Sequence, residues 1–417
     1  MDRRVFVRAG GLALVSMGLD PIFLDRAAYA TGRRAGRKTL VCIFQRGAVD
    51  GLNMIVPHGD PLYYRERPRI AVRDALDLDG YFGLHPAMAP LLPFWRAGTL
   101  GIVHAAGSPA RTRSHFDAQD YMETGTPDNK HTEDGWLSRH LAAARCAAPD
   151  CADHDREHAD TPFRGVAMGA QLPRILRGST PALAVGDLQT FGIRARGAAG
   201  DRISRAFESM YAGGASGIVA SSSAEGFEAV RMLRAADLAR FGPRDGVEYP
   251  RSPFGQAMAR LARLLKADLG TEIAFADVGG WDTHVNQGAS DGQLAARLRD
   301  FASGLAAFTL DLGEQMADVV VLTMSEFGRT IAENGSTGTD HGRATAMMVM
   351  GGGARRGIHG RWPGLDPADR ADGRDLAVTT DFRDLFGEVL VKHLGNTDLR
   401  QVFPGFAADQ ARWVGVL

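Results

Sequence analysis

The chain has 417 residues, and 45% of them are hydrophobic, which is enough to build a large core. Its 48 Lys and Arg residues nearly balance its 49 Asp and Glu residues, so the formal net charge is −1. Nucleic-acid binding relies on a strongly basic surface, and we therefore expect no nucleic-acid partner. Length alone would allow two or three domains, but large α/β chains often fold as one, and no internal repeat divides this sequence.

Residues 1–30 have the order of an export signal. Arg3 and Arg4 open a basic stretch that resembles the twin-arginine consensus, a mildly apolar run covers residues 9–19, and Ala28-Tyr29-Ala30 offers a small-residue cleavage site. The apolar run is far shorter than the roughly 20 residues that cross a bilayer. We expect the twin-arginine export machinery to deliver a mature chain, without a transmembrane segment, to the periplasm or the medium. The alternative is an N-terminal helix that merely begins with arginines.

Apolar strands alternate with amphipathic helices along residues 31–417, which we interpret as one domain. The predicted strands are residues 38–44, 99–105, 271–278, 318–324 and 346–350, and the predicted helices are 202–211, 225–240, 253–269, 288–313 and 381–394, with another starting after Ser114. The pattern predicts an α/β fold with a doubly wound, mostly parallel sheet and helices on both faces. Polar insertions near residues 140–165 and 195–250 interrupt it.

The three cysteines fall into two groups. Cys42 lies in an apolar strand and is expected to be a small buried hydrophobe. Cys146 and Cys151 flank a short turn, and an oxidising compartment would let them pair. A solvated insertion is the plainer alternative, and the nearby histidines follow too closely for a zinc finger.

Carboxylates, histidines and other polar residues follow the predicted strands. In chain order they are Asp50, Arg113 with Ser114, Asp282 with His284, Glu326 with Arg329, and Asp340 with His341. Active residues gather beyond the carboxyl ends of strands in open α/β sheets, so we expect these side chains to converge. Such ligands suit divalent cations, and arginines in the same loops could bind the oxygens of an anionic substrate.

Each of these residues also has a structural explanation. Asp50 could close a turn before glycine, Ser114 could be only a helix N-cap, and Glu326 with Arg329 could form a local ion pair. Asp282 and His284 alternate along the chain, so an extended segment would place both on one face. Three other histidines are expected to be structural groups, namely His85, His104 and His393.

Five blocks carry a resemblance to a known family. They are Gly47-Ala-Val-Asp-Gly-Leu-Asn53, Ser114-His-Phe-Asp-Ala-Gln119, Gly279-Gly-Trp-Asp-Thr-His284, Ser325-Glu-Phe-Gly-Arg-Thr330 and Thr339-Asp-His-Gly342. Together with the signal, they resemble an exported bacterial family of unknown function, numbered 1501 among the domain-of-unknown-function families. That family is similar to the alkaline-phosphatase-like superfamily, which includes sulfatases and phosphodiesterases. The resemblance implies a doubly wound sheet and two divalent metal ions, zinc first, with calcium, magnesium or manganese as alternatives.

The resemblance also implies roles for individual residues. Ser114 is similar to the superfamily's nucleophile, and Arg113 and Arg329 would bind the substrate's oxygens. The implied metal ligands are Asp50, Asp282, His284, Glu326, Asp340 and His341. The sequence departs from the superfamily in two places, because only Thr283 separates Asp282 from His284 and because Phe327 stands where a metal-binding histidine usually follows.

The expected function is therefore an exported metal-dependent hydrolase of small anionic phosphate or sulfate esters. The segment Ser108-Pro-Ala-Arg111 lacks the residue between Ser and Pro that sulfatases have, which argues against classical sulfatase chemistry. One alternative is a non-catalytic envelope protein that keeps the fold for binding or assembly, and Phe327 favours it. A serine hydrolase based on Ser114 ranks last, since no Gly-x-Ser-x-Gly elbow is present.

Overall fold

The computed structural model describes residues 37–143, 161–186, 228–233 and 235–417. The predicted signal, Cys146, Cys151 and the predicted helix 202–211 lie outside these residues. The described chain forms a mixed α/β structure around one nine-stranded sheet, in which β11-β5-β10-β9-β1-β8-β6-β7 is the strand order and β12 pairs with β5. The strands are β1 (Thr39–Gln45), β5 (Leu100–Gly107), β6 (Gly165–Ala167), β7 (Leu183–Ala184), β8 (Ile273–Val278), β9 (Val319–Met324), β10 (Thr345–Gly351), β11 (Gly357–His359) and β12 (Thr380–Asp381).

Most neighbouring strands are parallel, as the sequence predicted. The central strand β1 pairs in parallel with both β8 and β9, so that Ile43 lies between Ala276 and Thr323. Strand β10 is the exception, because it runs antiparallel to β9 and β5. As a result, the residues just before β10 reach the same edge of the sheet as the residues just after β1, β5, β8 and β9. This edge carries the candidate site.

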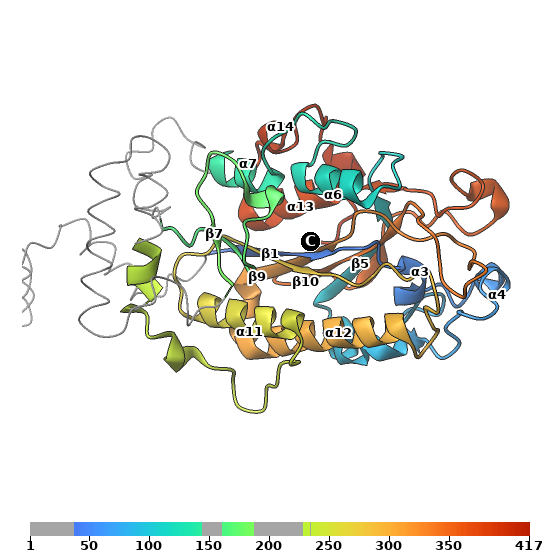
Figure 1. Ribbon diagram of the computed structural model, residues 1–417, viewed down its shortest axis with the longest axis horizontal. Helices are drawn as coiled ribbons and strands as arrows, with labels where there is room; N and C mark the ends of the chain where they lie inside the picture. The colour runs from blue at the N-terminus through green and yellow to red at the C-terminus, as the bar shows by residue number, and fades with distance from the viewer. Residues whose placement is uncertain (1–36, 144–160, 187–227, 234) are drawn as a thin grey trace, which may run out of the picture.

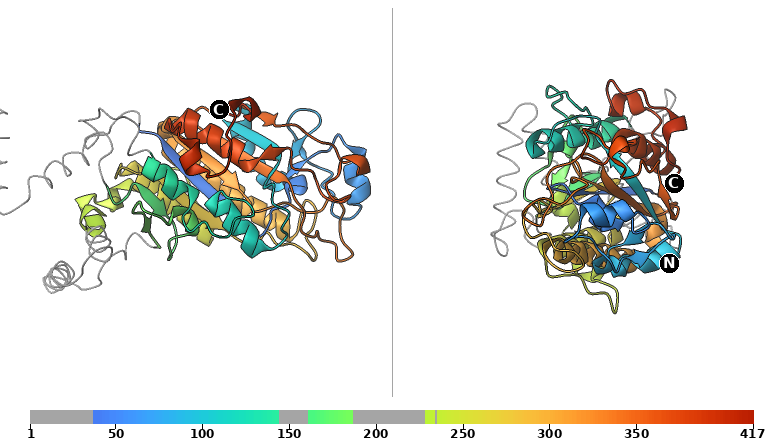
Figure 2. Two further views of the ribbon diagram at one scale, coloured as in Figure 1. Left: turned by 90° about the horizontal axis from the view of Figure 1, so that it is seen from above. Right: turned by 90° about the vertical axis from the view of Figure 1, so that its right-hand side faces the viewer.

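Both faces of the sheet are buried, which explains why its strands are apolar without alternation. Along β1, Val41 and Ile43 belong to one core cluster, whereas Cys42 and Phe44 belong to another. One helical layer contains η1 (Pro86–Leu91), α5 (Leu92–Arg96), α11 (Pro253–Lys266) and α12 (Gln293–Leu312) (Figure 1). The other contains α6 (His115–Thr124), α7 (Trp136–Ala143), α13 (Phe382–Leu394) and α14 (Leu399–Val402), and further views show the sheet between the two layers (Figure 2).

The helix ends follow local sequence signals. The hydroxyl of Ser252 caps α11, whose first residue is proline. The carboxylate of Asp381 caps α13, and Gly395 ends that helix in a left-handed conformation. Helix α12 starts at Gln293 rather than at the predicted residue 288, because Gly288 and Gly292 both have positive φ angles and so hold a turn before it.

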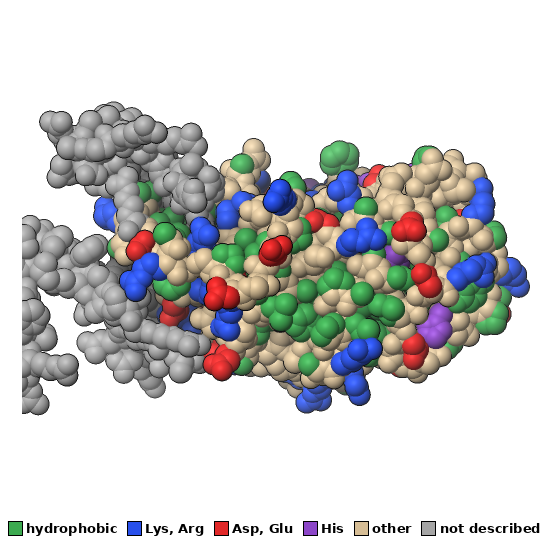
Figure 3. Space-filling model, turned by 90° about the horizontal axis from the view of Figure 1, so that it is seen from below, with side chains coloured by type: hydrophobic (Ala, Val, Ile, Leu, Met, Phe, Trp, Pro, Cys, Tyr) green, Lys and Arg blue, Asp and Glu red, His purple; other side chains and the backbone are tan. Residues whose placement is uncertain are grey.

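Smaller elements complete the described chain. A three-stranded sheet joins β2 (Ile55–Val56), β4 (Gly83–Leu84) and β3 (Leu76–Asp77), next to α3 (Gly51–Met54) and α4 (Pro61–Glu66). The other short 3₁₀ turns are η2 (Arg174–Leu176), η3 (Leu238–Phe241), η4 (Gly313–Asp318), η5 (Pro367–Asp369) and η6 (Gln410–Arg412). On the face seen from below, charged side chains of both signs surround a hydrophobic patch (Figure 3). Within the described residues, no helix has the length and apolarity to cross a membrane.

Candidate metal centre

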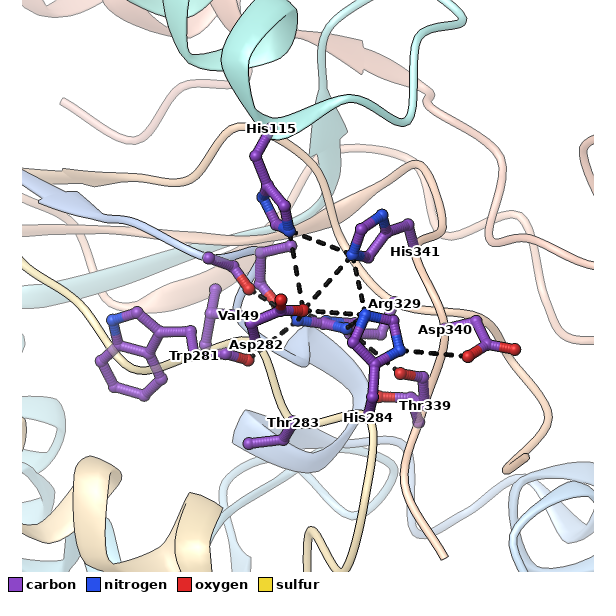
Figure 4. Close-up of polar contacts among 12 residues, drawn as sticks. Val49, His115, Trp281, Asp282, Thr283, His284, Arg329, Thr339, Asp340 and His341 are labelled. Atoms are coloured by element: carbon purple, nitrogen blue, oxygen red, sulfur yellow. Dashed lines mark hydrogen bonds and ion pairs between the residues drawn. The ribbon is translucent and has the colours of Figure 1, made fainter. Parts of the chain in front are cut away.

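Four side chains converge at the edge of the sheet where β1, β5, β8 and β9 end. His115 is the first residue of α6, Asp282 and His284 follow β8, and His341 precedes β10. Their rings and carboxylate point toward one another from separate segments of the chain (Figure 4). The antiparallel direction of β10 is what brings His341 to this group.

The donor atoms of these four residues are closely spaced. The Nε2 atom of His341 lies 3.0 Å from Nε2 of His115 and 2.9 Å from Nε2 of His284. Asp282 Oδ1 lies 3.0 Å from Nε2 of His284, 3.3 Å from that of His341 and 3.6 Å from that of His115. Four ligands around a tetrahedral zinc ion, at about 2.0–2.1 Å from it, would lie about 3.3 Å apart. These five separations are close to those between ligands of one ion. The residues whose donor atoms all lie within 4.8 Å of one another are His115, Asp282 and His341, and His284 adjoins them through Asp282 and His341.

The outer nitrogen of each imidazole has a partner that only accepts hydrogen bonds. Nδ1 of His341 donates to the backbone oxygen of Arg113 at 2.9 Å. Nδ1 of His115 lies 2.8 Å from a carboxylate oxygen of Glu326, and Nδ1 of His284 lies 3.1 Å from one of Asp340. Each Nδ1 must therefore carry the proton, and in the neutral ring Nε2 keeps its lone pair.

The Nε2 atoms of His115 and His341 and the Asp282 carboxylate consequently form one compact group, and Nε2 of His284 borders it next to Asp282 and His341. Neutral rings of this tautomer have no Nε2 proton to join one Nε2 atom to another, so a cation between these atoms would stabilise their close approach. The guanidinium of Arg329 already lies near one of them, with Nη1 3.5 Å from Nε2 of His284. Histidines that bind metals commonly donate their second nitrogen to a carboxylate or a carbonyl. We call His115, Asp282, His284 and His341 the donor group, and its chemistry fits a metal ion.

Glu326 lies behind His115, where it orients the imidazole instead of joining the donor group. Its Oε1 atom accepts hydrogen bonds from His115, from Gln119 at 2.9 Å and from the backbone nitrogen of Gly47 at 2.8 Å. Burial alone would raise the pKa of this fully buried carboxyl, but the hydrogen bonds, that of His115 foremost, lower it. The same hydrogen bond raises the pKa of His115 above its usual value despite partial burial.

Arg329 supports the donor group from the interior of the protein. Its guanidinium is fully buried and donates to Asp282 Oδ1 at 2.5 Å and to backbone oxygens that include those of Gly47 and Ala48. Burial would raise the pKa of Asp282, but Arg329 lowers it. With all its donors committed to the protein, Arg329 holds the site together and is not placed as the free substrate-binding arginine that we expected.

Asp340 takes a position similar to that of Glu326. Its carboxylate accepts from Nδ1 of His284 and from the side chain of Asn334 at 3.0 Å, and both hydrogen bonds, that of Asn334 foremost, lower its pKa. His341 has a lowered pKa, mainly because of burial. Asp340 therefore acts in the structure on a histidine of the donor group and not as a member of it.

Glycine allows the loops of the site to pack closely. Gly47 has a φ angle of +115°, and a Cβ atom there would lie 3.0 Å from the backbone nitrogen of Asp282. Phe327 closes the site on another side, with its ring 4.9 Å from that of His115 and 5.1 Å from that of His341. Phe327 therefore packs against two histidines of the donor group and is not itself a ligand.

Asp50 is separate from the donor group, in contrast to the predicted role as a metal ligand. Its Oδ2 atom pairs with the guanidinium of Arg67 at 2.6 Å and accepts from Gln287 at 2.7 Å, while Oδ1 caps α3. Both members of the ion pair are almost completely buried. Since Gln287 also accepts hydrogen bonds from the hydroxyls of Thr283 and Thr339, Asp50 stabilises the two loops that carry the donors.

The structure confirms the structural alternative for Ser114, the helix N-cap, and pairs the side chain of Arg113 with carboxylates. Ser114 is exposed and caps α6, its Oγ accepting from the backbone nitrogen of Asp117 at 3.5 Å, and within the described residues it makes no hydrogen bond to the donor group. The guanidinium of Arg113 pairs with Asp372 and Asp375. Only the backbone oxygen of Arg113 takes part in the site. Within the described residues, neither side chain makes a hydrogen bond or ion pair with the donor group.

The sequence predictions can now be compared with the site. Of the six predicted ligands, Asp282, His284 and His341 come together, whereas Asp50, Glu326 and Asp340 make other contacts. His115 was missed, although it follows Ser114 in a block that the resemblance singled out. Within the described ranges, His115, Asp282 and His341 form a group of possible ligands whose donor atoms lie within 4.8 Å of one another, and His284 lies next to it. These residues provide for one ion where the resemblance implies two.

Comparison with known proteins places the chain in a family. No curated protein matches it. A family model described as "Protein of unknown function (DUF1501)" matches residues 85–415, a range that includes all four residues of the donor group. Because this match covers most of the 417 residues, the chain belongs to the DUF1501 family of proteins of unknown function.

Proposed function

We propose that this protein is an exported hydrolase of phosphate or sulfate esters that depends on a metal ion held by the donor group. The observation that carries the proposal is the cluster of three Nε2 atoms around the Asp282 carboxylate, in which each Nδ1 atom has its own acceptor. Export rests on the twin-arginine pattern of the first residues. We also propose, from the sequence resemblance, that the fold is similar to that of alkaline-phosphatase-like enzymes.

The chemistry of the donors suggests which ion would bind. Three imidazoles with one carboxylate suit zinc and other transition metals better than calcium or magnesium, which prefer oxygen ligands. The charges agree with a cation, because three carboxylates, those of Asp282, Glu326 and Asp340, lie at or behind the donors, and the buried guanidinium of Arg329 pairs with only one of them, Asp282.

When bound, such an ion would polarise an ester oxygen and lower the pKa of a water molecule at the site. The protein's own groups would keep the site in order. Glu326 and Asp340 fix the imidazole planes of His115 and His284, and Arg329 fixes Asp282. The Asp282 side chain is 46% exposed, and all its contacts within the described chain use Oδ1. Its Oδ2 atom is left to accept a hydrogen bond from water.

We assign the attacking group to water rather than to Ser114. The hydroxyl of Ser114 is used as the N-cap of α6 and does not contact the donor group. Water, by contrast, can reach the site through the exposed side of Asp282. Under this mechanism Ser114→Ala would affect helix α6 more than turnover.

Metal analysis combined with an ester panel tests the proposal. The purified full-length chain should hold one transition-metal ion per molecule and hydrolyse 4-nitrophenyl phosphate, bis(4-nitrophenyl) phosphate or 4-nitrophenyl sulfate, with activity lost on chelation and restored by zinc. His115→Ala should lose the ion, whereas His58→Ala, a histidine paired with Asp77 in the small sheet region, should keep it. A tightly bound ion without turnover of any ester would favour the alternative, a non-catalytic envelope protein that keeps the fold for binding or assembly. If the purified protein held no ion, the proposal would be refuted.

A further inference from the structure

Two exposed hydrophobic side chains stand directly next to the donor group in sequence. The large hydrophobic residues that are exposed in the described chain are Phe116 (89%), Val285 (54%) and Leu310 (56%). Phe116 follows His115, and Val285 follows His284. Single exposed hydrophobic residues are common on protein surfaces, but two of these three adjoin residues of one site.

Phe116 and Val285 border the donor group along the chain, and we call these two positions the rim. Phe116 lies in the first turn of α6, directly after His115, whose ring points to the donor group (Figure 4). Its own side chain is 89% exposed and is therefore open to a bound molecule.

Val285 occupies the rim on a different segment. Trp281 and Thr283 point into the protein, whereas Asp282 and His284 are accessible, and Val285 begins the turn that passes through Asn286 at a φ angle of +50°. His115 and His284 approach the donor group from opposite sides (Figure 4). Apolar surface thus adjoins the donor group on two elements.

We propose that the substrate is an amphiphilic ester, in which an apolar and preferably aromatic group is joined to the anionic head. This inference rests on the proposed function, because it assumes that the metal-loaded donor group takes the anion. The apolar part would then lie against Phe116 and Val285. Aromatic rings gain from offset or edge-to-face packing in addition to the burial of their area, so a flat ring suits Phe116 better than a sugar or a glycerol group does.

Binding of two phosphonates that are not hydrolysed tests this inference. The probes are methylphosphonic acid and 1-naphthylmethylphosphonic acid, which share the head group, and calorimetry would measure their dissociation constants on the zinc-loaded full-length protein. We expect the naphthyl probe to bind at least tenfold more tightly. Phe116→Ser should reduce this ratio about fivefold to tenfold, and Val285→Ser should reduce it less.

Leu310→Ser provides the matched control. Leu310 is apolar and, at 56%, about as exposed as Val285 at 54%. It lies near the C-terminal end of α12, whose N-terminal end is the one that follows the donor loops. This variant should keep the wild-type ratio, and thermal unfolding should show that all three variants are folded.

The outcomes separate the two proposals. The inference would be overturned if the two probes bound equally well, or if Phe116→Ser and Val285→Ser left the ratio of their dissociation constants unchanged. This holds even if esters are hydrolysed. A ratio that depends on Phe116, with no ester hydrolysed, would uphold apolar recognition and refute the hydrolase.

Discussion

Glu326 and His115 are joined by a hydrogen bond of 2.8 Å although 211 positions separate them in the sequence. Glu326 follows β9, and His115 begins the helix that follows β5. The bond therefore fixes α6 to the centre of the sheet at the point where the donor group lies. It also determines which nitrogen of His115 faces the other donors, so one contact links the fold to the chemistry of the site.

The first prediction concerns Glu326→Gln. Glutamine can still accept a hydrogen bond from His115, but the negative charge that makes the imidazole a better ligand is lost. Changes of this kind behind a metal ligand commonly reduce affinity by about 10–100-fold. We expect zinc affinity to fall by about this factor, as measured by competition with a chromogenic chelator.

Glu133→Gln is the control for this measurement, because Glu133 is exposed, and its affinity for zinc should equal that of the wild type. A second measurement distinguishes an effect through His115 from general damage. In the metal-free protein, the raised pKa of His115 should move back toward its usual value in Glu326→Gln, as followed by NMR of the ring protons. Unchanged affinity together with an unchanged pKa would show that Glu326 does not act on the site.

The sequence allowed much of the fold to be predicted. The five predicted strands correspond to β1, β5, β8, β9 and β10 with ends that differ by a few residues at most, because each is a β-branched or apolar run that ends in a polar loop. The direction of β10 could not be predicted in this way. An apolar run has the same pattern whether it is parallel or antiparallel to its neighbours, yet this direction decides where His341 lies.

In the candidate site, too, local sequence patterns were predictive, whereas contacts between residues far apart in the sequence could not be predicted. The convergence of Asp282 and His284 followed from their alternation in an extended segment, and Trp281 and Thr283 occupy the buried alternate positions. His115 was missed because a histidine at the start of a helix has no local pattern that marks it as a ligand. The prediction that Asp50 binds a metal rests on its place after the first strand and on the family resemblance. Its actual partner, Arg67, is 17 positions away, and no local pattern reveals a buried ion pair.

The second prediction follows from this ion pair. Asp50→Ala would leave the guanidinium of Arg67 buried without its counter-charge, a change that typically costs about 3–5 kcal/mol. We expect the free energy of unfolding to fall by about this amount, measured by urea titration of tryptophan fluorescence. Asp245→Ala removes an exposed carboxylate and should change it by less than about 0.5 kcal/mol.

Replacing both members of the pair gives a further check. Asp50→Leu combined with Arg67→Met removes the buried charges together and should recover part of the loss, since apolar residues often substitute for a buried ion pair without further cost. If Asp50→Ala instead lost its metal while keeping wild-type stability, Asp50 would belong to the metal site after all.

The third prediction concerns acid stability and uses Glu272, which lies just before β8. Its carboxylate accepts from His140 of α7 at 3.0 Å and from Arg164, next to β6, at 2.7 Å. Burial alone would raise the pKa of Glu272, but these two partners, His140 first, lower it from 4.5 to about 2. Glu272 therefore connects a helix and two strands through its charged form.

The direction of the pH effect follows from this lowered pKa. The unfolded chain binds the proton of Glu272 at higher pH than the folded chain does, so the stabilisation is complete above pH 4.5 and is lost as the pH falls toward 2. The loss is on the order of 3 kcal/mol for this one group. The measurement is urea unfolding of wild type and Glu272→Gln at pH 7 and at pH 3. Between these pH values, the free energy of unfolding should fall less for Glu272→Gln than for wild type. Glu314→Gln changes an exposed residue and should show the same fall as wild type. Equal falls in wild type and Glu272→Gln would mean that the carboxylate of Glu272 is not held by His140 and Arg164 in solution.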